Sequence, residues 1–312
     1  MKHIVSISIG SSKRNHKTQM ELLGETYVVE RRGTDGDIKK AIELVKELDG
    51  KVDAFGMGGI DVYLNAGKKR YKIKDALPIR AAAQKTPMVD GSGLKISLEK
   101  LVAHYINDNI EDLKNKKAFI LPAIDRYAMA EGFEEVGCQL NLGDLMVVLG
   151  IGIPIRSLRT LDRIAKVIAP IACKLPIEML YPTGKEQNKD TTKSGKFDKF
   201  FEEADIIAGD FHYIKQYMPP IMDNKIIVTN TVTKEDIEWL RDSGVRLLVT
   251  STPDLEGRSF GTNVIEALLV AFIGKSADEI TSDDYLCALE KINFKPRVEY
   301  LQENKLKAVI NK

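Results

Sequence analysis

The sequence predicts an α/β fold with two lobes, of which the second is a Rossmann-like, doubly wound and mostly parallel sheet. Short β-branched runs alternate with segments of helical periodicity along the 312 residues, as in parallel strands joined by crossover helices. The length lies between one large domain and two ordinary ones. A highly polar stretch at 107–117 precedes a fresh strand, so we expect an N-terminal α/β lobe at 1–112 and a Rossmann-like C-terminal lobe with terminal helices at 113–312.

In the first lobe the clearest element is a helix at 37–48, which carries five apolar residues on one face. Thr34 and Asp37 precede it and can cap its start. The other expected elements are strands at 2–9, 26–31, 52–57 and 86–89, helices near 76–84 and 98–106, and a hairpin at 60–74.

In the second lobe the alternation restarts with a strand at 118–121. A capping-box variant, Thr233 to Asp236, opens one helix. The segment 264–273 is apolar on nearly every side, which predicts a buried helix. The remaining elements are strands at 139–142, 204–208, 225–229 and 246–250, and helices at 126–136 and near 158–168.

Composition excludes several classes of function. Lys and Arg number 46 against 45 Asp and Glu, a formal charge of +1, which gives no electrostatic footprint for nucleic acid or an anionic membrane. The N-terminus lacks an export signal and no apolar run approaches the roughly 18 residues of a membrane span, so we expect a cytoplasmic protein. Three cysteines without a CxxC pair and four histidines without an HExxH pair predict no metal site. The expected partner is a small molecule, with a homo-oligomer possible.

Ligands of doubly wound sheets lie beyond the carboxyl ends of the strands, and several polar turns of the sequence follow predicted strands. Backbone N–H groups near glycines, together with a cationic side chain, can bind an anion. Solvated turn residues are the alternative interpretation. The candidate substrate- or anion-binding residues are Gly91, Ser92, Gly93, Lys95, Ser11, Ser12 and Lys185.

A dinucleotide, NAD or NADP, is most naturally placed where the second lobe begins. The strand, helix and strand there end at Asp144, in the position of a ribose-binding acid, although an ordinary strand-end carboxylate is the alternative. The turn at 121–126 contains no glycine. Arg126, or a second turn between the strand at 246–250 and the helix at 264–273, would therefore have to contact the pyrophosphate. The residues of that later turn are Gly257, Arg258, Gly261 and Thr262. By contrast, the glycines at 56–59 precede a hairpin, which predicts a bend with close backbone packing.

Proton transfer would fall to His212, with Asp210 and Tyr213 beside it after the strand at 204–208. An imidazole has an unperturbed pKa of about 6.5 and can accept a hydroxyl proton at cellular pH. A structural turn histidine is the alternative.

The whole chain resembles a group of bacterial proteins, mainly from anaerobic Firmicutes, labelled quinate 5-dehydrogenase. The segments that carry the resemblance are 33–37 (GTDGD), 53–61 (DAFGMGGID), 89–95 (VDGSGLK), 181–185 (YPTGK), 204–212 (ADIIAGDFH) and 257–263 (GRSFGTN). The resemblance implies a two-lobed dehydrogenase, with a polyol in one lobe and NAD or NADP in the other. The Asn-x-Thr-x-Pro-x-Lys motif that carries the catalytic lysine of quinate and shikimate dehydrogenases is absent from this sequence.

Together these observations predict an NAD(P)-dependent oxidoreductase that acts on a small polar hydroxy or keto metabolite, such as one similar to quinate or shikimate. The competing class is a non-redox protein that binds a nucleotide or a phosphorylated metabolite through the same turns.

Overall fold

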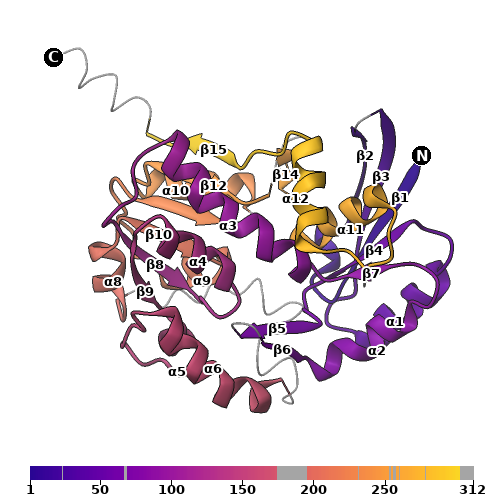
Figure 1. Ribbon diagram of the computed structural model, residues 1–312, viewed down its shortest axis with the longest axis horizontal. Helices are drawn as coiled ribbons and strands as arrows, with labels where there is room; N and C mark the ends of the chain where they lie inside the picture. Colours follow the sequence, from indigo (N-terminus) through magenta and orange to yellow (C-terminus); the bar gives the residue numbers. More distant parts are fainter. Residues whose placement is uncertain are drawn as a thin grey trace. The chain divides into compact units, whose positions relative to one another are not determined.

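The computed structural model confirms the α/β class, with two mostly parallel sheets in two compact units (Figure 1). It describes residues 1–22, 24–66, 69–173, 195–230, 232–252, 254–255, 258–259, 261–277 and 279–302. Unit 1 comprises Met1–Ser97, Ala165–Lys189 and Gly261–Phe294, and unit 2 comprises Leu98–Ile164, Asp190–Phe260 and Lys295–Lys312.

The division into units differs from a single boundary near residue 112. The cause is helix α11 (Thr262–Ile273), which contacts strands β1 (Lys2–Ser8) and β4 (Ala54–Gly58) of unit 1. Eight of its residues are buried, because an apolar helix must be covered on several sides. The C-terminal part of the chain therefore completes the first unit.

The sheet of unit 1 has the strand order β2-β3-β1-β4-β7. Strands β3 (Glu25–Gly33), β1, β4 and β7 (Met88–Val89) are parallel, and β2 (His16–Leu22) pairs with β3 in the antiparallel direction. Strand β2 was not predicted from the sequence, since its residues are mostly polar and lie at the edge of the sheet. The four parallel strands were predicted, within two or three residues at their ends.

Helices cover both faces of this sheet. On one face α1 (Ile38–Leu48) and α2 (Leu77–Ala82) pack against alternate residues of the central strands, such as Val5 and Phe55. Asp37 caps α1 by accepting a hydrogen bond from the Lys40 N–H. On the other face lies α11, and a Cβ at Gly56 would stand 2.8 Å from the Asn263 carbonyl oxygen. Close packing is thus the role of this glycine, as predicted.

Shorter elements complete unit 1. The predicted hairpin is present as β5 (Tyr63–Ala66) and β6 (Lys69–Lys72). The others are the 3-10 turns η1 (Ser12–Arg14) and η2 (Lys74–Ala76) and helix α12 (Ser282–Lys291).

The sheet of unit 2 has the strand order β9-β8-β10-β11-β12-β15. Its strands are β8 (Lys117–Leu121), β9 (Gln139–Leu142), β10 (Ile206–Gly209), β11 (Ile226–Thr229), β12 (Leu247–Thr250) and β15 (Arg297–Tyr300). All pairs are parallel except that of β12 with β15. Only β15 was not predicted.

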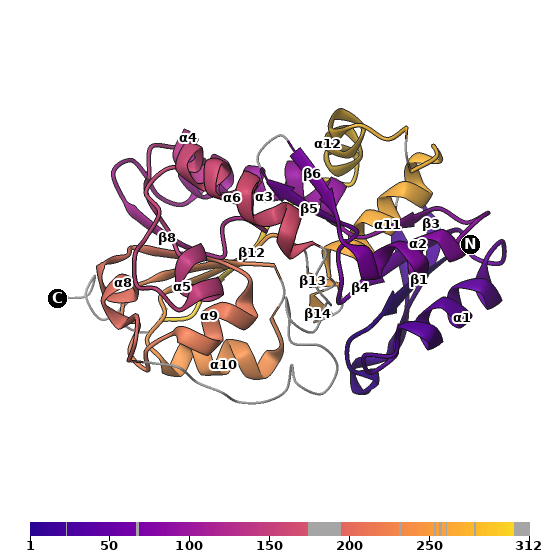
Figure 2. The same cartoon turned by 90° about the horizontal axis from the view of Figure 1, so that it is seen from below.

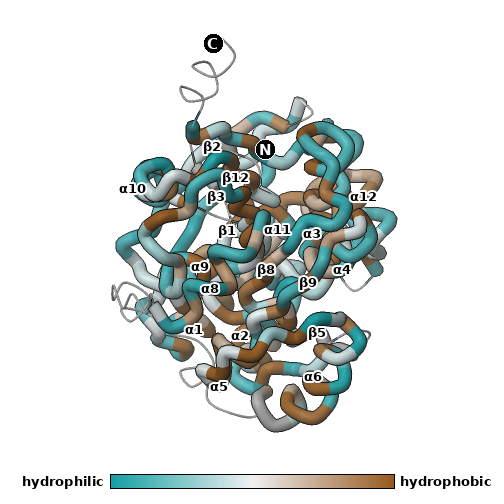
Figure 3. The backbone as a smooth tube through the Cα atoms, turned by 90° about the vertical axis from the view of Figure 1, so that its left-hand side faces the viewer, coloured by the Kyte–Doolittle hydropathy of each residue, from teal (hydrophilic) through white to brown (hydrophobic). Residues whose placement is uncertain are grey.

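Both faces of this sheet are apolar, because alternate residues of each strand enter different cores. Ala118 and Ile120 of β8 pack in one core, and Phe119 and Leu121 pack in the other. Figure 2 shows α3, α4 and α6 on one side of the sheet and α8, α9 and α10 on the other. Figure 3 colours β8 and the nearby α5 brown, as hydrophobic. The helices are α3 (Ser92–Asn109), α4 (Tyr127–Glu135), α5 (Asp144–Leu149), α6 (Leu158–Ala172), α8 (Asp198–Glu203), α9 (Phe211–Tyr217) and α10 (Lys234–Asp242).

The strand order places a topological switch point between β8 and β10. The chain leaves β8 through α4 toward β9 on one side, and β10 occupies the other side of β8. In open α/β sheets this is the place where the carboxyl ends of two strands open a crevice for a ligand. Among the described residues no helix is long and apolar enough to cross a membrane.

Gly209 at the end of β10 is required for this arrangement. Its φ is +131°, and a Cβ there would stand 2.0 Å from the Leu121 carbonyl oxygen of β8.

Gly209→Ala should therefore lower the free energy of unfolding by about 3 kcal/mol or more, from backbone strain and separation of the two strands. Gly195→Ala is the matched control in unit 2, because φ there is +100° and no atom lies within 4 Å. Urea unfolding followed by circular dichroism measures both, and equal losses would contradict the role given to Gly209.

Candidate functional site

Arg126 lies at the switch point of unit 2, directly before α4, and is 2% exposed. Its guanidinium contacts three carboxylates: Glu99 of α3, Asp210 at 3.1 Å and Asp125 at 3.4 Å. Burial alone would lower the pKa of Arg126, but the charges of these carboxylates outweigh burial and hold it well above its usual value. This network ties the end of β8 to α3 and to the start of α9.

Asp210 joins the network to the predicted proton-transfer residues. One carboxylate oxygen contacts Arg126, and the other accepts a hydrogen bond from the His212 N–H at 2.9 Å, which caps α9. His212 and Tyr213 occupy the first turn of that helix, with ring centroids 5.8 Å apart. The three residues lie together after β10, as expected, and they form the start of a helix. The Asp210 side chain is 31% exposed, so solvent and ligands reach it.

Tyr213 differs chemically from its two neighbours. Burial, and then the nearby negative charge of Asp210, raise the pKa of its hydroxyl. It therefore stays protonated at neutral pH, as a hydrogen-bond donor and not as a base.

Asp144 performs a different task from the expected ribose contact. It is 6% exposed, and its two oxygens accept hydrogen bonds from the backbone N–H groups of Ala123 at 3.2 Å and Ile124 at 2.8 Å. Burial raises the pKa of Asp144 to about 6 despite these bonds. The side chain acts as a strand-end carboxylate that holds the turn after β8, which corresponds to the alternative interpretation of the sequence.

These contacts test whether a dinucleotide fits the turn after β8. A pyrophosphate needs free backbone N–H groups at the helix start and glycines that let it approach. Here Asp144 accepts hydrogen bonds from two N–H groups of the turn that precedes α4, the turn has no glycine, and Arg126 is surrounded by carboxylates. The residues predicted to hold NAD or NADP at this turn do not fit the group.

Polar groups also mark the ends of β11 and β12. The Thr229 hydroxyl donates to the Gly209 carbonyl at 2.8 Å, and the Thr252 hydroxyl donates to the Asn230 carbonyl. Ser251 is fully buried, and its Oγ has no hydrogen-bond partner in the part of the chain that the structure describes. This edge of unit 2 is polar from β8 to β12.

In unit 1 the predicted anion turn at 91–95 is occupied by carboxylates of the chain itself. The Gly91 N–H donates to Glu266 at 2.5 Å, and both the N–H and the hydroxyl of Ser92 donate to Asp90. Lys95 pairs with Asp61 at 2.7 Å. A Cβ at Gly93 would stand 2.4 Å from the Glu266 Oε1, so this glycine lets α11 approach.

Glu266 was missed by the sequence analysis, although it is the single charged residue within the apolar segment 264–273. It is 3% exposed and also accepts a hydrogen bond from the Tyr285 hydroxyl at 2.7 Å. Burial, and then the charge of Asp90, raise its pKa to about 7. The sequence signal that could have identified Glu266 is a single acidic residue within a segment predicted to be a buried helix.

The remaining predicted residues lie apart from these clusters in the sequence. The Ser11 hydroxyl accepts from the Lys13 N–H, and the Ser12 N–H donates to Asp35 at 2.8 Å. Arg258 belongs to strand β14 (Arg258–Ser259), which pairs with β13 (Asp254–Leu255), while Gly261 and Thr262 begin α11. Gly257 and Lys185 lie outside the described residues. Among the residues that are described, no group of three or more side chains could hold a metal ion.

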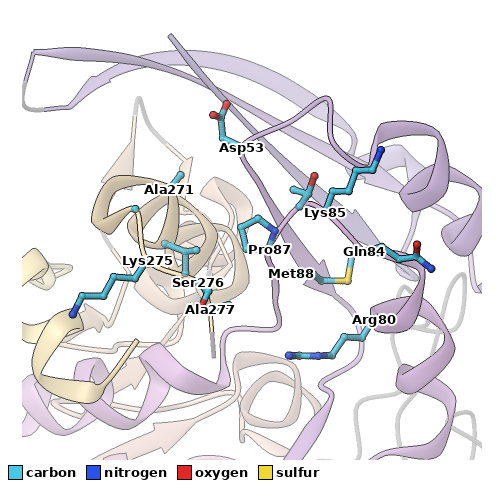
Figure 4. A pocket seen from close by; sticks show the side chains of 14 residues that line it. Asp53, Arg80, Gln84, Lys85, Pro87, Met88, Ala271, Lys275, Ser276 and Ala277 are labelled. Atoms are coloured by element: carbon cyan, nitrogen blue, oxygen red, sulfur yellow. The ribbon is translucent and has the colours of Figure 1, made fainter. Parts of the chain in front are cut away.

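A cavity of about 550 Å³ lies elsewhere in unit 1, beside the amino ends of β4 and β7 and the C-terminal end of α11 (Figure 4). Asp53, Arg80, Pro87 and Ser276 contribute to its lining. None of the predicted site residues does. We therefore place the candidate site at the switch point of unit 2, where Arg126, Asp210, His212 and Tyr213 lie.

The fold and the polar strand ends define a Rossmann-like α/β protein. The chain belongs to the family described as Domain of unknown function (DUF8754), which matches residues 93–301, and Domain of unknown function (DUF8753) matches residues 3–90. No curated protein matches the sequence.

Solved structures with a similar arrangement include enzymes and binding proteins. Entamoeba histolytica malic enzyme gives a TM-score of 0.42 at 13% identity, covering 97% of this chain and 66% of that one. A glutamate dehydrogenase gives 0.40 at 11%, covering 93% and 71%. A periplasmic ribose ABC transporter protein from Conexibacter woesei gives 0.38 at 11%, covering 100% and 95%.

The raised pKa of Glu266 predicts how stability depends on pH. The folded state binds this proton more tightly than the unfolded state, whose carboxyl titrates near 4.5. The contribution of Glu266 to the free energy of unfolding is thus largest below pH 4.5, falls as the pH rises to about 7, and is constant above. The loss is on the order of 3 kcal/mol.

Glu266→Gln should flatten this part of the stability profile, because the amide stays neutral at every pH. Glu290→Gln on α12, an exposed position, is the control and should leave the profile unchanged. Denaturant unfolding at half-unit steps from pH 4 to 8 measures the effect. Parallel profiles for the wild type and Glu266→Gln would show that Glu266 is not the titrating group.

Proposed function

We propose that the chain binds a small polar metabolite with hydroxyl groups at the carboxyl edge of the unit 2 sheet, between β8 and β10. The observation that carries the proposal is the half-exposed carboxylate of Asp210 at the switch point, fixed by Arg126 on one side and by the start of α9 on the other. The proposal assigns no dinucleotide to the turn after β8, because the turn has no glycine and Asp144 already accepts from two of its N–H groups.

The charge of the site favours hydroxyl groups over phosphate. One guanidinium, that of Arg126, stands among the carboxylates of Glu99, Asp125 and Asp210. Carboxylate oxygens accept hydrogen bonds and repel other anions, so they suit a ligand that donates O–H groups. The proposal thus departs from the phosphorylated ligand that the glycine turns predict.

Preorganisation is the second support. A ligand-binding side chain contributes more when its position is fixed before the ligand arrives. Asp210 has both of its oxygens engaged with rigid neighbours, Arg126 and the backbone of α9. Inositol, an uncharged polyol, is the first ligand to test. The resemblance to proteins labelled quinate 5-dehydrogenase adds quinate and shikimate, which would have to direct their hydroxyl groups toward Asp210 and their carboxylates away from it.

The oxidoreductase predicted from the sequence keeps one supporting observation, which is that Asp210, His212 and Tyr213 do lie together. An imidazole beside a bound hydroxyl can take its proton. Hydride transfer, however, requires a nicotinamide cofactor bound next to the substrate, and the turn predicted to hold it does not fit.

Asp210→Asn tests the binding site. Asparagine is also a good N-cap, so α9 should remain intact, while a charged hydrogen bond to the ligand is lost. Affinity for the responding compound should fall about tenfold to a hundredfold. Calorimetry with quinate, shikimate, inositol and simple 2-hydroxy acids measures it, with the exposed Asp242→Asn as control. Unchanged affinity in Asp210→Asn, or no binding of any compound at millimolar concentration, would refute the proposal.

The cofactor is tested separately. Titration with NAD⁺, NADH, NADP⁺ and NADPH at millimolar concentrations should give no binding heat and no thermal stabilisation, because the turn after β8 has no glycine and Asp144 already accepts from two of its N–H groups. A cofactor that binds and whose affinity changes in Asp144→Asn would instead support the oxidoreductase.

A further inference from the structure

Arg31 of β3 in unit 1 has an unusual set of partners. Its Nη1 donates to the Ser11 carbonyl at 2.9 Å and to the Asn15 side-chain oxygen at 3.4 Å, and its Nη2 donates to the Ser8 hydroxyl at 2.9 Å. All three acceptors are neutral. Other arginines that lie partly or fully inside the protein, such as Arg32, Arg126 and Arg246, each contact a carboxylate. In the described part of the chain no ion pair is found for Arg31.

This arrangement is energetically unfavourable without a further partner. Charged side chains that leave water are normally paired with an opposite charge. Burial, and then the like charge of Arg14, lower the pKa of Arg31 to about 10. The charge of Asp35 acts in the opposite direction and raises the pKa, and one oxygen of Asp35 accepts a hydrogen bond from the Ser12 N–H.

The backbone brings this group to the carboxyl edge of the unit 1 sheet. Ser8 ends β1 and Gly33 ends β3, and the loop after β1 returns toward β3. A Cβ at Gly33 would stand 2.6 Å from the Ser11 carbonyl and 2.8 Å from the Gly10 carbonyl. Only glycine allows the loop to come so close, and the approach carries the second cation, Arg14, toward Arg31.

The guanidinium also retains donors for a ligand. It has five N–H groups, of which three are used by the acceptors above. The two that remain are the Nε–H and one Nη2–H. These nitrogens are neighbours on one side of the planar group, the arrangement with which arginine binds a carboxylate or a phosphate through two parallel hydrogen bonds.

We propose that Arg31, assisted by Arg14, binds the anionic group of a ligand, a carboxylate or a phosphate, at the carboxyl edge of the unit 1 sheet. The inference goes beyond the proposed function, since it uses residues of unit 1 alone and stands or falls independently of Asp210. It also gives the Gly10 to Ser12 turn a purpose, which is to place Arg14 and to accept from Arg31.

The test uses the full chain with inorganic phosphate and, separately, acetate as probes, at constant ionic strength set with chloride. The Arg31 Nε–H signal in a ¹⁵N spectrum, assigned by its absence in Arg31→Gln, should shift as the anion is added. Binding should weaken about tenfold or more in Arg31→Gln and by a smaller factor in Arg14→Gln. A response to phosphate alone or to acetate alone supports the site and identifies the ligand group.

Arg32→Gln is the matched control, because Arg32 lies next in the same strand and is already paired with Glu30 at 2.6 Å. It should bind the probes as the wild type does. Arg31→Lys keeps the charge and removes the two parallel N–H donors of the guanidinium. It provides the same comparison if Arg31→Gln does not fold. The proposal is overturned if neither anion shifts the Arg31 signal at 50 mM, if Arg31→Gln and Arg31→Lys bind as the wild type does, or if Arg32→Gln loses binding equally.

Discussion

The buried guanidinium of Arg126 organises the candidate site of unit 2. Its contacts with Glu99 and Asp210 connect α3, the end of β8 and the start of α9. Replacing Arg126 would leave the buried carboxylate of Glu99 without this cation, and breaking such a buried pair typically costs 3–5 kcal/mol. Because Asp210 also caps α9, its carboxylate can hardly move, and His212 and Tyr213 keep their places beside it. The polar edge that a ligand would meet is therefore fixed by this ion-pair network.

Both units satisfy the N–H groups of their strand-end turns in the same way, with a carboxylate supplied by the chain. Asp144 does so after β8 and Glu266 does so after β7, and burial raises the pKa of each carboxyl, to about 6 and about 7. Arg31 shows the opposite situation, since no carboxylate of the described residues forms an ion pair with it. Two strand-end turns are thus closed by acids of the chain itself, whereas Arg31 is the group that we propose for an external anion.

The sequence was sufficient for the parallel strands and most long helices, because apolar periodicity and caps such as Thr233 are local signals. It was insufficient where a distant segment decides the outcome. Nothing near residue 112 reveals that α11 returns to the first sheet, and the polar strand β2 is formed only through pairing with β3. The same contrast between local signals and contacts of distant segments applies to the site residues. Asp210, His212 and Tyr213 directly follow β10 and their position could be predicted because it is local, whereas the contact of Glu266 with Gly91 joins residues 175 positions apart.

The central claim is that Asp144 fills the turn after β8, so that the ligand site lies at Asp210 instead of at a pyrophosphate turn. The most direct measurement is an NMR titration that follows the carboxyl carbon of Asp144 together with the amide protons of Ala123 and Ile124. The account predicts that all three signals titrate together with a pKa near 6 and do not respond to NAD(H) or NADP(H). An Asp144 carboxyl that titrates near its ordinary value of 3.8, with amide signals that shift when a dinucleotide is added, would contradict it.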